Sequence, residues 1–418
     1  MSITRRGVLA LPGLAALPAA IPVAAGAASP VRIGYIEPLT GNAGSAGQSI
    51  KQGVTLALNI INTPHPDLAP LTLAAGAGLT GLGGAPVEVV WADNQGSPAV
   101  GQGDALRLIT EDHVVALCGA YQSSITLTAS AVAERYGIPF VTGESVAANL
   151  TERGYKWFFR TTPFGPDFGK LYLDFLADVA KTGLATGKIA IVHENTDYGT
   201  SVANSITGAA TARGRKIAQT ISYNANGTDV SPQVLELKSG NPDVVIFISY
   251  TSDSILYMKT FHSLGYRPPI VIGDDSGFSD PAFAKTVGDL AQGALNRSAF
   301  VPGKPGSLSY KVNALFKQQT GRDLDDTTAR SMQGFFVLCD AINRAGSTRP
   351  DAIRAALAAT DLPASALMIG YKGVKFDSSG QNTLAYSLMI QLQGPGYVPV
   401  WPAEEATAKL ELPFKGWT

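Results

Sequence analysis

The chain has 418 residues, more than one ordinary hydrophobic core accommodates, so we expect two domains. Hydrophobic residues make up 45% of it and charged residues 16%, as in globular proteins. Its 32 basic and 33 acidic residues give a formal net charge of −1, which offers no basis for recognition of nucleic acid or of an anionic membrane.

The first 28 residues have the features of an export signal. Arg5 and Arg6 precede a mildly apolar stretch over 8–23, and small residues lead to an expected cleavage near Ala28. The paired arginines are similar to those of Tat-type signals. The apolar run is short for a membrane-spanning helix, and no later segment is long and apolar enough to be one. We therefore expect an exported, soluble protein.

After this signal, strand-like and helix-like segments alternate in two series. The first series has predicted strands at 31–39, 86–93, 114–119 and 138–143, and predicted helices at 47–62, 98–112 and 125–137. The second series has predicted strands at 188–194, 216–223, 243–249 and 269–274, and predicted helices at 200–214, 230–238 and 252–265. This alternation predicts an α/β fold with two doubly wound parallel sheets. Two later helices, at 307–321 and 327–346, are expected to return to the first domain.

Sequence patterns typical of enzymes and cofactor sites are incomplete. GAGLTG, at 76–81, matches a dinucleotide-binding fingerprint, but a strand follows where a helix is required, so a flexible loop is predicted. The stretches GESVA and GTSVA, around Ser145 and Ser201, lack the second glycine of a hydrolase nucleophile elbow. No spacing predicts a metal site, and DLDDTT, at 323–328, is interpreted as a solvated helix N-terminus. We expect no catalytic residue, no metal and no cofactor.

Polar residues gather where predicted strands end. Tyr121, Ser123 and Ser124 lie between a strand and a helix, and Glu144 and Ser145 follow the next strand. Ligands of doubly wound sheets bind beyond the carboxyl ends of strands, where helix N-termini offer free N–H groups. Hydroxyl and N–H donors there suit a small carboxylate or carbonyl. Simple helix capping is the alternative. Our hypothesis is that the serine pair both holds a ligand and caps the helix.

Five stretches resemble, in their order and spacing, the type I periplasmic substrate-binding proteins of ABC transporters, in the branched-chain amino acid (Leu/Ile/Val) group. They are IGYIEPLTGNAGSAGQSIKQGVTLALNIIN, YQSSITLTASAVAERYGIPFV, NLTERGYKWFFRTTP, HENTDYGTSVA and LGYRPPIVIGDDS. The resemblance implies two lobes, joined by three crossover strands, that close on a ligand by hinge motion. Lobe I would comprise 29–164 and 299–372, and lobe II 165–298 and 373–418. The three crossings are expected near 162–166, 296–301 and 373–377.

The same resemblance assigns ligand-binding roles. The residues concerned are Tyr121, Ser123, Ser124, Glu144, Ser145, Tyr198, Tyr250 and Asp275. The serines would hold a ligand carboxylate, Tyr198 and Tyr250 would form an aromatic wall from lobe II, and Asp275 would hold the ligand's ammonium. The alternatives are half-buried loop tyrosines for the two aromatic residues, and an Asx turn for Asp275 and its neighbour Asp274.

Departures from the family pattern leave the ligand open. Ala46 stands where a pocket aromatic is often found, and Glu144 stands where a small residue is usual. An extra carboxylate would repel a ligand carboxylate unless it points away. The loop over 64–86 is also longer than the resemblance implies. An amino acid is the first choice; an aromatic carboxylate and an amide or urea-like solute are the others.

The resemblance further implies a periplasmic location and delivery of the ligand to ABC transporter permease subunits. A monomer is expected. The rival function is a ligand sensor that presents its ligand to a receptor. Cys118 and Cys339 are the only cysteines, and whether they pair is left open, because export permits a disulfide but both lie in apolar runs typical of buried thiols.

Overall fold

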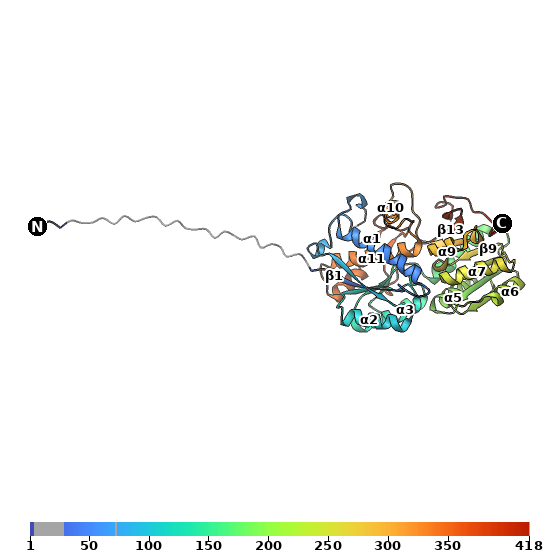
Figure 1. Ribbon diagram of the computed structural model, residues 1–418, viewed down its shortest axis with the longest axis horizontal. Coiled ribbons are helices and arrows are strands. Elements are labelled where there is room, and N and C mark those ends of the chain that lie inside the picture. The colour runs from blue at the N-terminus through green and yellow to red at the C-terminus, as the bar shows by residue number, and fades with distance from the viewer. Residues whose placement is uncertain (4–28, 72, 418) are drawn as a thin grey trace.

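The computed structural model describes residues 1–3, 29–71 and 73–417, arranged as two lobes (Figure 1). The apolar stretch and paired arginines of the expected export signal lie outside the described residues. Among the helices that are described, none has the length and apolar character needed to cross a membrane.

Lobe I is built on a five-stranded parallel sheet with the strand order β2-β1-β3-β4-β5. Its strands are β1 (Val31–Glu37), β2 (Val87–Asp93), β3 (Ala116–Gly119), β4 (Phe140–Thr142) and β5 (Phe158–Arg160). The order changes direction at β1, because β2 lies on one side of it and β3 on the other. Such a switch is where doubly wound sheets bind ligands.

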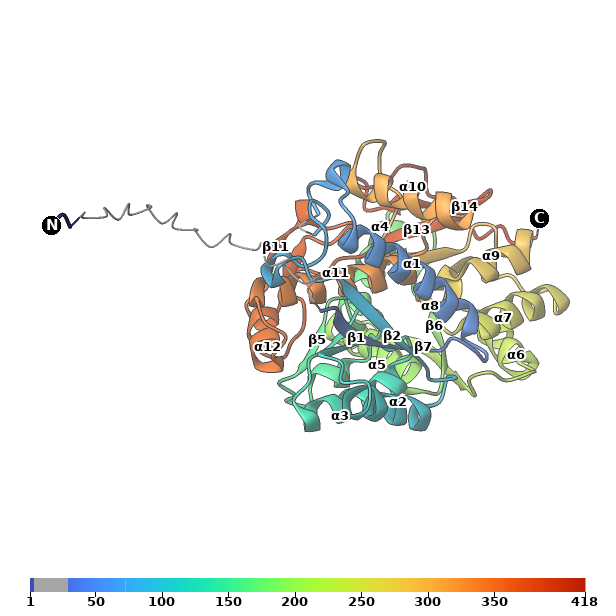
Figure 2. The same ribbon diagram turned by 60° about the vertical axis from the view of Figure 1, so that its left-hand side comes forward.

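Helices cover both faces of this sheet (Figure 2), with α2 and α3 on one face and α1 and α11 on the other. The helices of lobe I are α1 (Gly44–Asn62), α2 (Pro98–Thr110), α3 (Ser123–Tyr136), α10 (Leu308–Thr320), α11 (Asp326–Ala345) and α12 (Pro350–Ala358). On α1, Ile50, Val54, Ala57 and Ile61 form a buried stripe at helical spacing. The contacts of α10 and α11 with α1 confirm that the later helices return to this part of the molecule.

Lobe II contains a seven-stranded sheet with the order β14-β13-β10-β9-β8-β6-β7. Its strands are β6 (Ile189–Glu194), β7 (Ile217–Tyr223), β8 (Val244–Ile248), β9 (Ile270–Gly273), β10 (Leu295–Ser298), β13 (Leu388–Gln393) and β14 (Gly396–Trp401). Strands β10, β9, β8, β6 and β7 are parallel to one another; β6 to β9 were predicted as strands of a parallel sheet, and β10 was expected only as a crossing between the lobes. The last two are antiparallel additions that the sequence analysis did not predict, because their short hairpin lacks a helical crossover.

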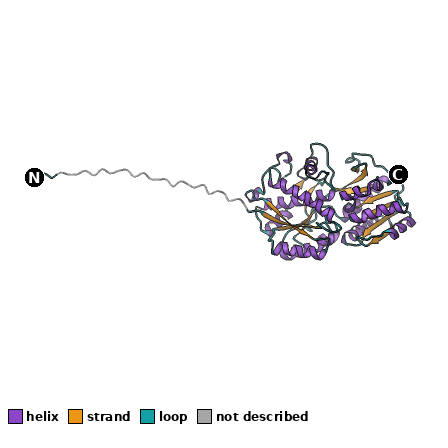
Figure 3. Ribbon diagram, in the orientation of Figure 1, coloured by secondary structure: helices purple, strands orange, loops and turns teal. Residues whose placement is uncertain are grey.

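The helices of lobe II also pack on two faces of their sheet (Figure 3). They are α4 (Gly165–Ala180) and α5 (Asp197–Ala212) on one face, and α6 (Ser231–Gly240), α7 (Thr251–Ser263), α8 (Ser276–Ser279) and α9 (Pro281–Val287) on the other side. The β8 residues Ile246 and Phe247 point into different hydrophobic clusters, as neighbours on a strand buried on both faces must. The two lobes thus confirm the predicted α/β class.

Arg160, the last residue of β5, ties together the first and third passages of the chain between the lobes. It is fully buried, and its Nε donates to Gln381 at 2.6 Å while one terminal nitrogen donates to the Ala147 carbonyl at 2.6 Å. Its guanidinium lies 4.5 Å from the ring centre of Phe164 in the first passage. Burial without an adjoining ion pair lowers the pKa of Arg160 to about 9.

The third passage lies later in the chain than expected. Arg160 forms a parallel bridge with Gln381 and exchanges backbone hydrogen bonds with Gly380 and Asn382, so this stretch belongs beside the sheet of lobe I. A two-stranded antiparallel sheet, β11 (Asp361–Pro363) and β12 (Gly373–Lys375), precedes it. Since β13 begins at Leu388, the chain passes between the sheets after Asn382 instead of over 373–377.

The glycine-rich segment over 64–86, of which 76–81 was predicted to be a flexible loop, is packed against lobe I. It contains short 3-10 helices at Pro66–Leu68 and Thr80–Leu82, and Leu71, Leu73 and Leu79 are buried. The Gly81 N–H donates to the side chain of Asn343 on α11 at 2.8 Å. A Cβ at Gly81 would lie 2.0 Å from the Asn343 carbonyl oxygen, so the absence of a side chain permits this close approach.

Candidate functional site

The residues predicted to bind ligand lie together at the interface between the lobes. Lobe I contributes the segments that follow β3 and β4, and lobe II contributes the starts of α5 and α7 and the turn after β9. All are buried except Ser124, which is half-buried. The structure therefore brings the predicted residues to one place, at the carboxyl ends of parallel strands, where doubly wound sheets bind ligands.

The two serines do not cap α3 as expected. The N-cap is Gln122, which has an extended backbone and forms no capping hydrogen bond with its side chain, and Ser123 is already the first helical residue. The Ser123 Oγ instead accepts a hydrogen bond of 3.3 Å from the backbone N–H of Ala147, in the loop after β4. Its hydroxyl proton is left to donate elsewhere. Ser145, in the same loop, lies 2.6 Å from the Thr126 hydroxyl.

Three tyrosine rings form a continuous aromatic group across the interface. The ring centre of Tyr250 lies 5.7 Å from that of Tyr121 and 5.4 Å from that of Tyr198, so rings of lobe II meet a ring of lobe I. The Tyr198 hydroxyl donates to the Asp274 carboxylate at 2.9 Å. Within the described residues, no hydrogen bond reaches the buried hydroxyl of Tyr121 or of Tyr250. Of the three tyrosine hydroxyls, only that of Tyr198 is therefore paired within the described residues.

Asp275, the predicted partner of a ligand ammonium, is already paired with arginine. Its carboxylate accepts a hydrogen bond from Arg330 of α11, and Arg297 of β10 lies 3.6 Å away. All three side chains are buried. Although burial opposes ionisation, Arg330 and Arg297 hold the pKa of Asp275 below its ordinary value. The backbone of Asp275 has φ +56°, a left-handed conformation that is uncommon outside glycine.

The pairing of Asp275 belongs to a larger network of buried charges. Arg330 also binds Asp326 at 2.8 Å, and Arg297 binds Asp274 at 2.8 Å. Arg330 donates to the carbonyls of Gly143 and Glu144 as well, each at 3.1 Å. Asp326 was interpreted from the sequence as part of a solvated helix start. That interpretation is wrong, because the Asp326 carboxylate binds Arg330 and the backbone N–H of Ala299 in the protein interior.

Neither arginine of this network is among the site residues predicted from the sequence. Arg330 lies in the largely buried helix α11, which also carries Asp326, Gln333 and Asp340, and Arg297 lies in the buried strand β10. An isolated arginine in a segment predicted to be buried requires an acidic partner, because an unpaired buried charge is costly. That signal was present in the sequence. Of the partners of Arg330, Asp326 lies four residues earlier on the same helix and was visible in the sequence, whereas Asp275 was not, because it lies far away along the chain.

Lobe I also contains a buried acid, Glu37, that forms no ion pair within the described residues. Glu37, at the end of β1, is 0% exposed, and its Oε2 accepts a hydrogen bond of 3.3 Å from the Tyr121 N–H. Glu144 is also buried, with Oε1 3.4 Å from the Tyr35 hydroxyl. Burial, together with the nearby Glu144, raises the pKa of Glu37 well above its usual value. Burial likewise raises the pKa of Glu144.

The lobes are joined by further direct contacts. The Ser45 hydroxyl at the start of α1 donates to the Asp280 carboxylate of lobe II at 3.0 Å. On another part of the interface, the Ala148 N–H donates to the Ser201 hydroxyl at 2.8 Å. Ser201, considered above as a nucleophile, therefore serves as an interlobe contact. The lobes are closed upon each other in this structure.

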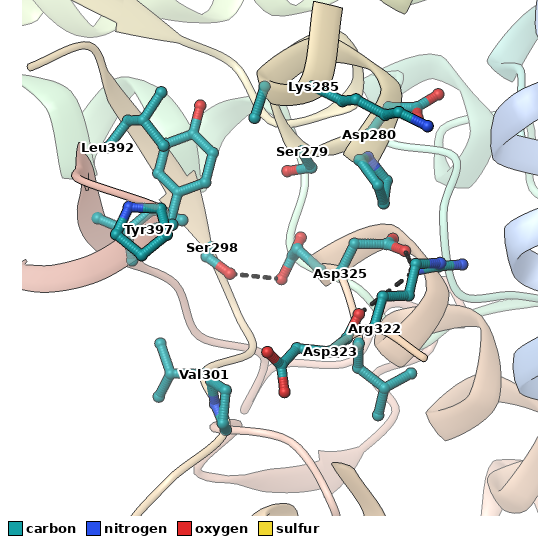
Figure 4. Close-up of a pocket in the computed structure, with 18 of the residues that line it drawn as sticks. Ser279, Asp280, Lys285, Ser298, Val301, Arg322, Asp323, Asp325, Leu392 and Tyr397 are labelled. Atoms are coloured by element: carbon teal, nitrogen blue, oxygen red, sulfur yellow. Dashed lines mark hydrogen bonds and ion pairs between the residues drawn. The ribbon is translucent and has the colours of Figure 1, made fainter. Parts of the chain in front are cut away.

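A cavity of about 600 Å³ adjoins the charge network (Figure 4). Lobe II lines it with α9, β10 and β13, and lobe I lines it with the 321–326 segment before α11. Ser298 and Asp326 are in its wall, 2.9 Å apart. None of the eight predicted ligand-binding residues, all of which are described, lines it. The cavity is therefore beside the predicted site, with Asp326 and Arg330 between them.

Comparisons with known proteins agree on one family. Residues 30–390 match the family model described as periplasmic binding protein. The Leu/Ile/Val-binding protein homolog 7 of Brucella abortus (strain 2308) is 30% identical over 405 residues, which cover 93% of this chain and 96% of that protein.

Two solved structures show the same fold. The leucine binding protein LivK of Thermotoga maritima MSB8 superposes with a TM-score of 0.75 at 21% identity, over 89% of this chain and 98% of that one. A solute binding protein of an ABC transporter from Rhodopseudomonas palustris BisB5, in complex with 3,4-dihydroxy benzoic acid, superposes with a TM-score of 0.70 at 18% identity, over 92% and 98%. At these identities the likeness extends to the fold alone.

Proposed function

Because this chain belongs to the periplasmic binding protein family, we propose that it is the exported periplasmic component of an ABC importer, which captures an amino acid between its lobes. Lobe I would hold the ligand's carboxylate with the Ser123 hydroxyl and the free N–H groups at the start of α3. Lobe II would cover the ligand with the rings of Tyr198 and Tyr250. The closed, loaded form would then be delivered to the permease subunits.

One observation carries this proposal: unsatisfied polar groups from the strand ends converge with an aromatic group that spans both lobes. Tyr121 joins the two parts, since its backbone lies beside Ser123 and its ring contacts Tyr250. Buried hydroxyls without partners are rare in folded proteins and are expected where a ligand completes the hydrogen bonds. The Brucella relative is named as a homologue of Leu/Ile/Val-binding proteins, which supports an amino acid.

A second candidate ligand is an aromatic carboxylate. The three tyrosine rings favour it, because aromatic side chains stack well on a planar ring. The pairing of Asp275 with Arg330 also favours it, because a ligand without an ammonium makes no demand on Asp275. The related structure from Rhodopseudomonas palustris was solved with such an acid. Transport remains the proposed role for either ligand.

A thermal unfolding screen of the protein from residue 29 onward would test the proposal. The panel would contain the aliphatic, aromatic and charged amino acids, benzoate and hydroxybenzoates, and short amides. A ligand at about 100 times its Kd stabilises the folded state by about 2.7 kcal/mol, which raises the Tm measurably. We expect an amino acid to give the largest increase. A rise in Tm with hydroxybenzoates alone would establish the second candidate, and no rise with any compound would contradict the proposed binding function.

A further inference from the structure

The acids at the lobe interface fall into two kinds. Asp274, Asp275 and Asp326 each form an ion pair with a buried arginine. Glu37 forms no ion pair within the described part of the chain, and its Oε1 has no hydrogen-bond partner there. A fully buried carboxyl group in this condition is costly, so its retention at the interface calls for a partner that the chain does not supply.

The position of Glu37 places it at the predicted ligand site. Glu37 ends β1, the strand at which the sheet order changes direction, and its other oxygen binds the N–H of Tyr121. Tyr121 in turn contacts the ring of Tyr250 in lobe II and lies two residues before Ser123. Glu37 is therefore anchored to the segment that would hold the ligand carboxylate. In an amino acid the ammonium group is next to the carboxylate. A group that binds the ammonium is therefore needed close to that segment.

Glu144 adds to the negative character of this place. Tyr35 and Glu37 are two residues apart on β1, so their side chains lie on the same face of the strand. The Tyr35 hydroxyl binds Glu144, so Glu144 is buried on that face of the sheet as well. Arg330 approaches Glu144 at its backbone carbonyl, whereas no arginine of the described residues forms an ion pair with Glu37. Two carboxyl groups close together favour a bound cation, which would relieve both the burial of Glu37 and its repulsion from Glu144.

We propose that Glu37 of lobe I, with Glu144 adjoining it, receives the ammonium group of the ligand, and that Asp275 serves to position Arg330 and does not meet the ligand. This inference rests on the proposed amino-acid binding function. On this assignment, Glu37 is the residue that makes the protein bind an amino acid in preference to the corresponding deaminated acid. It also removes the repulsion expected between Glu144 and a ligand carboxylate, since the ligand would turn its cationic end toward this pair.

The test compares ligands that differ only in the ammonium group. Isothermal titration would measure the Kd of leucine and 4-methylpentanoate, phenylalanine and 3-phenylpropionate, and glutamate and glutarate. The proteins would be the wild type, Glu37→Gln and Glu88→Gln. Glu88 is an exposed glutamate on the adjacent strand β2, so its variant controls for the loss of one negative charge from lobe I. Far-UV circular dichroism and Tm would establish that each variant is folded.

We expect the wild type and Glu88→Gln to bind one amino acid at least 10-fold more tightly than its deaminated partner. In Glu37→Gln this preference should fall to about 3-fold or less, chiefly through weaker binding of the amino acid. An unchanged preference in folded Glu37→Gln would overturn the inference, and so would an equal loss of both ligands, which indicates a structural role. If the wild type binds no amino acid at all, the proposed function is overturned and this inference with it.

Glu37→Ala and Asp275→Asn provide the second line of the same test. If the first variant abolishes the preference and the second retains it in a folded protein, the ammonium is assigned to Glu37. If Asp275→Asn alone abolishes the preference, the ammonium is held by lobe II, and the inference is wrong while the proposed function stands.

Discussion

Two places at the lobe interface treat their buried acids in opposite ways. In lobe II, the negative charges of Asp274 and Asp275 are paired with buried arginines. One of these arginines, Arg330, belongs to lobe I. In lobe I, Glu37 is buried without compensation. An acid that the chain neutralises serves the fold, because its partner is always present. An acid that the chain leaves unpaired raises the free energy of the empty protein. That cost falls only when a cation binds beside the acid.

The largest expected effect comes from removing the arginine that joins the lobes. Arg330→Met leaves Asp275 and Asp326 buried with one cation fewer, and breaking a buried ion pair in this way costs about 3–5 kcal/mol. Arg322→Met is the matched control, since Arg322 is partly exposed and binds Asp325 at 3.1 Å, and a loss below about 1 kcal/mol is expected. Urea unfolding at pH 7 would measure both. Similar losses in the two variants would contradict the contrast between buried and exposed pairs.

Asp253 is a candidate for a buried acid without an ion pair that lies away from the lobe interface. This buried residue of α7 forms no ion pair within the described residues, and burial raises its pKa from 3.8 to about 6. The folded state therefore binds this proton more tightly than the unfolded state. Its contribution to stability is complete below about pH 4 and is lost as the pH rises through about 6, a change of at most about 3 kcal/mol.

Asp253→Asn should abolish that dependence, because asparagine keeps the acceptor for the Asn226 N–H without carrying a charge. The free energy of unfolding of the variant should exceed that of the wild type at pH 7 and approach it at pH 4. Measurements at intervals of one pH unit would show the divergence beginning near pH 4. A difference that is constant with pH would indicate that Asp253 is no uncompensated acid.

Two tyrosines of lobe II differ in whether their hydroxyls have a hydrogen-bond partner within the described residues. Tyr198→Phe removes a hydrogen bond to the charged Asp274, which should cost about 2 kcal/mol of stability. Tyr250→Phe removes a hydroxyl that no described residue binds, so a change below about 0.5 kcal/mol is expected in the empty protein. Thermal unfolding of the two variants side by side would measure this. If Tyr250→Phe is the more destabilising, its hydroxyl has a partner in the empty protein and is not reserved for a ligand.

The smallest expected effect concerns the serines of lobe I. Ser123→Ala should weaken ligand binding about 10-fold, or about 1.4 kcal/mol, because the hydroxyl proton left free by the Ala147 contact is lost as a donor. Ser124→Ala, in the half-buried neighbour, should change the Kd by less than about 3-fold. Titration with the best ligand of the panel would decide between them. The reverse order would move the carboxylate contact to Ser124.

The parts of the fold that depend on local pattern were predictable. Alternating apolar runs and amphipathic stretches predicted the sheets from β1 to β4 and from β6 to β9, because each such element buries its own residues. The three-residue strand β5 and the hairpin of β13 and β14 were not predicted. Their strands are short or antiparallel, and their place in a sheet is set by partners distant in the sequence.

The same limit applies to the site. The strand-end position of Ser123 and Ser145 was visible in the sequence, since turns after buried strands reveal themselves locally. The hydrogen bond that the Ser123 Oγ accepts from the Ala147 N–H, in place of a helix cap, was not visible, because it depends on how two loops meet. Glu37 had the same local signal as the serines, a polar residue at the end of an apolar strand, and could have been selected by that rule.

The packing of α1 against α11 has a consequence for the order in which the protein takes shape. The two helices share one core, yet residue 326, where α11 begins, is made long after residue 62, where α1 ends. At 5–20 residues per second, synthesis of the intervening chain takes on the order of tens of seconds. During that time the apolar stripe of α1 has no helix to cover it, while most of lobe II is completed from contiguous sequence. The core that α1 and α11 share can therefore form only after the chain has been synthesised through residue 345.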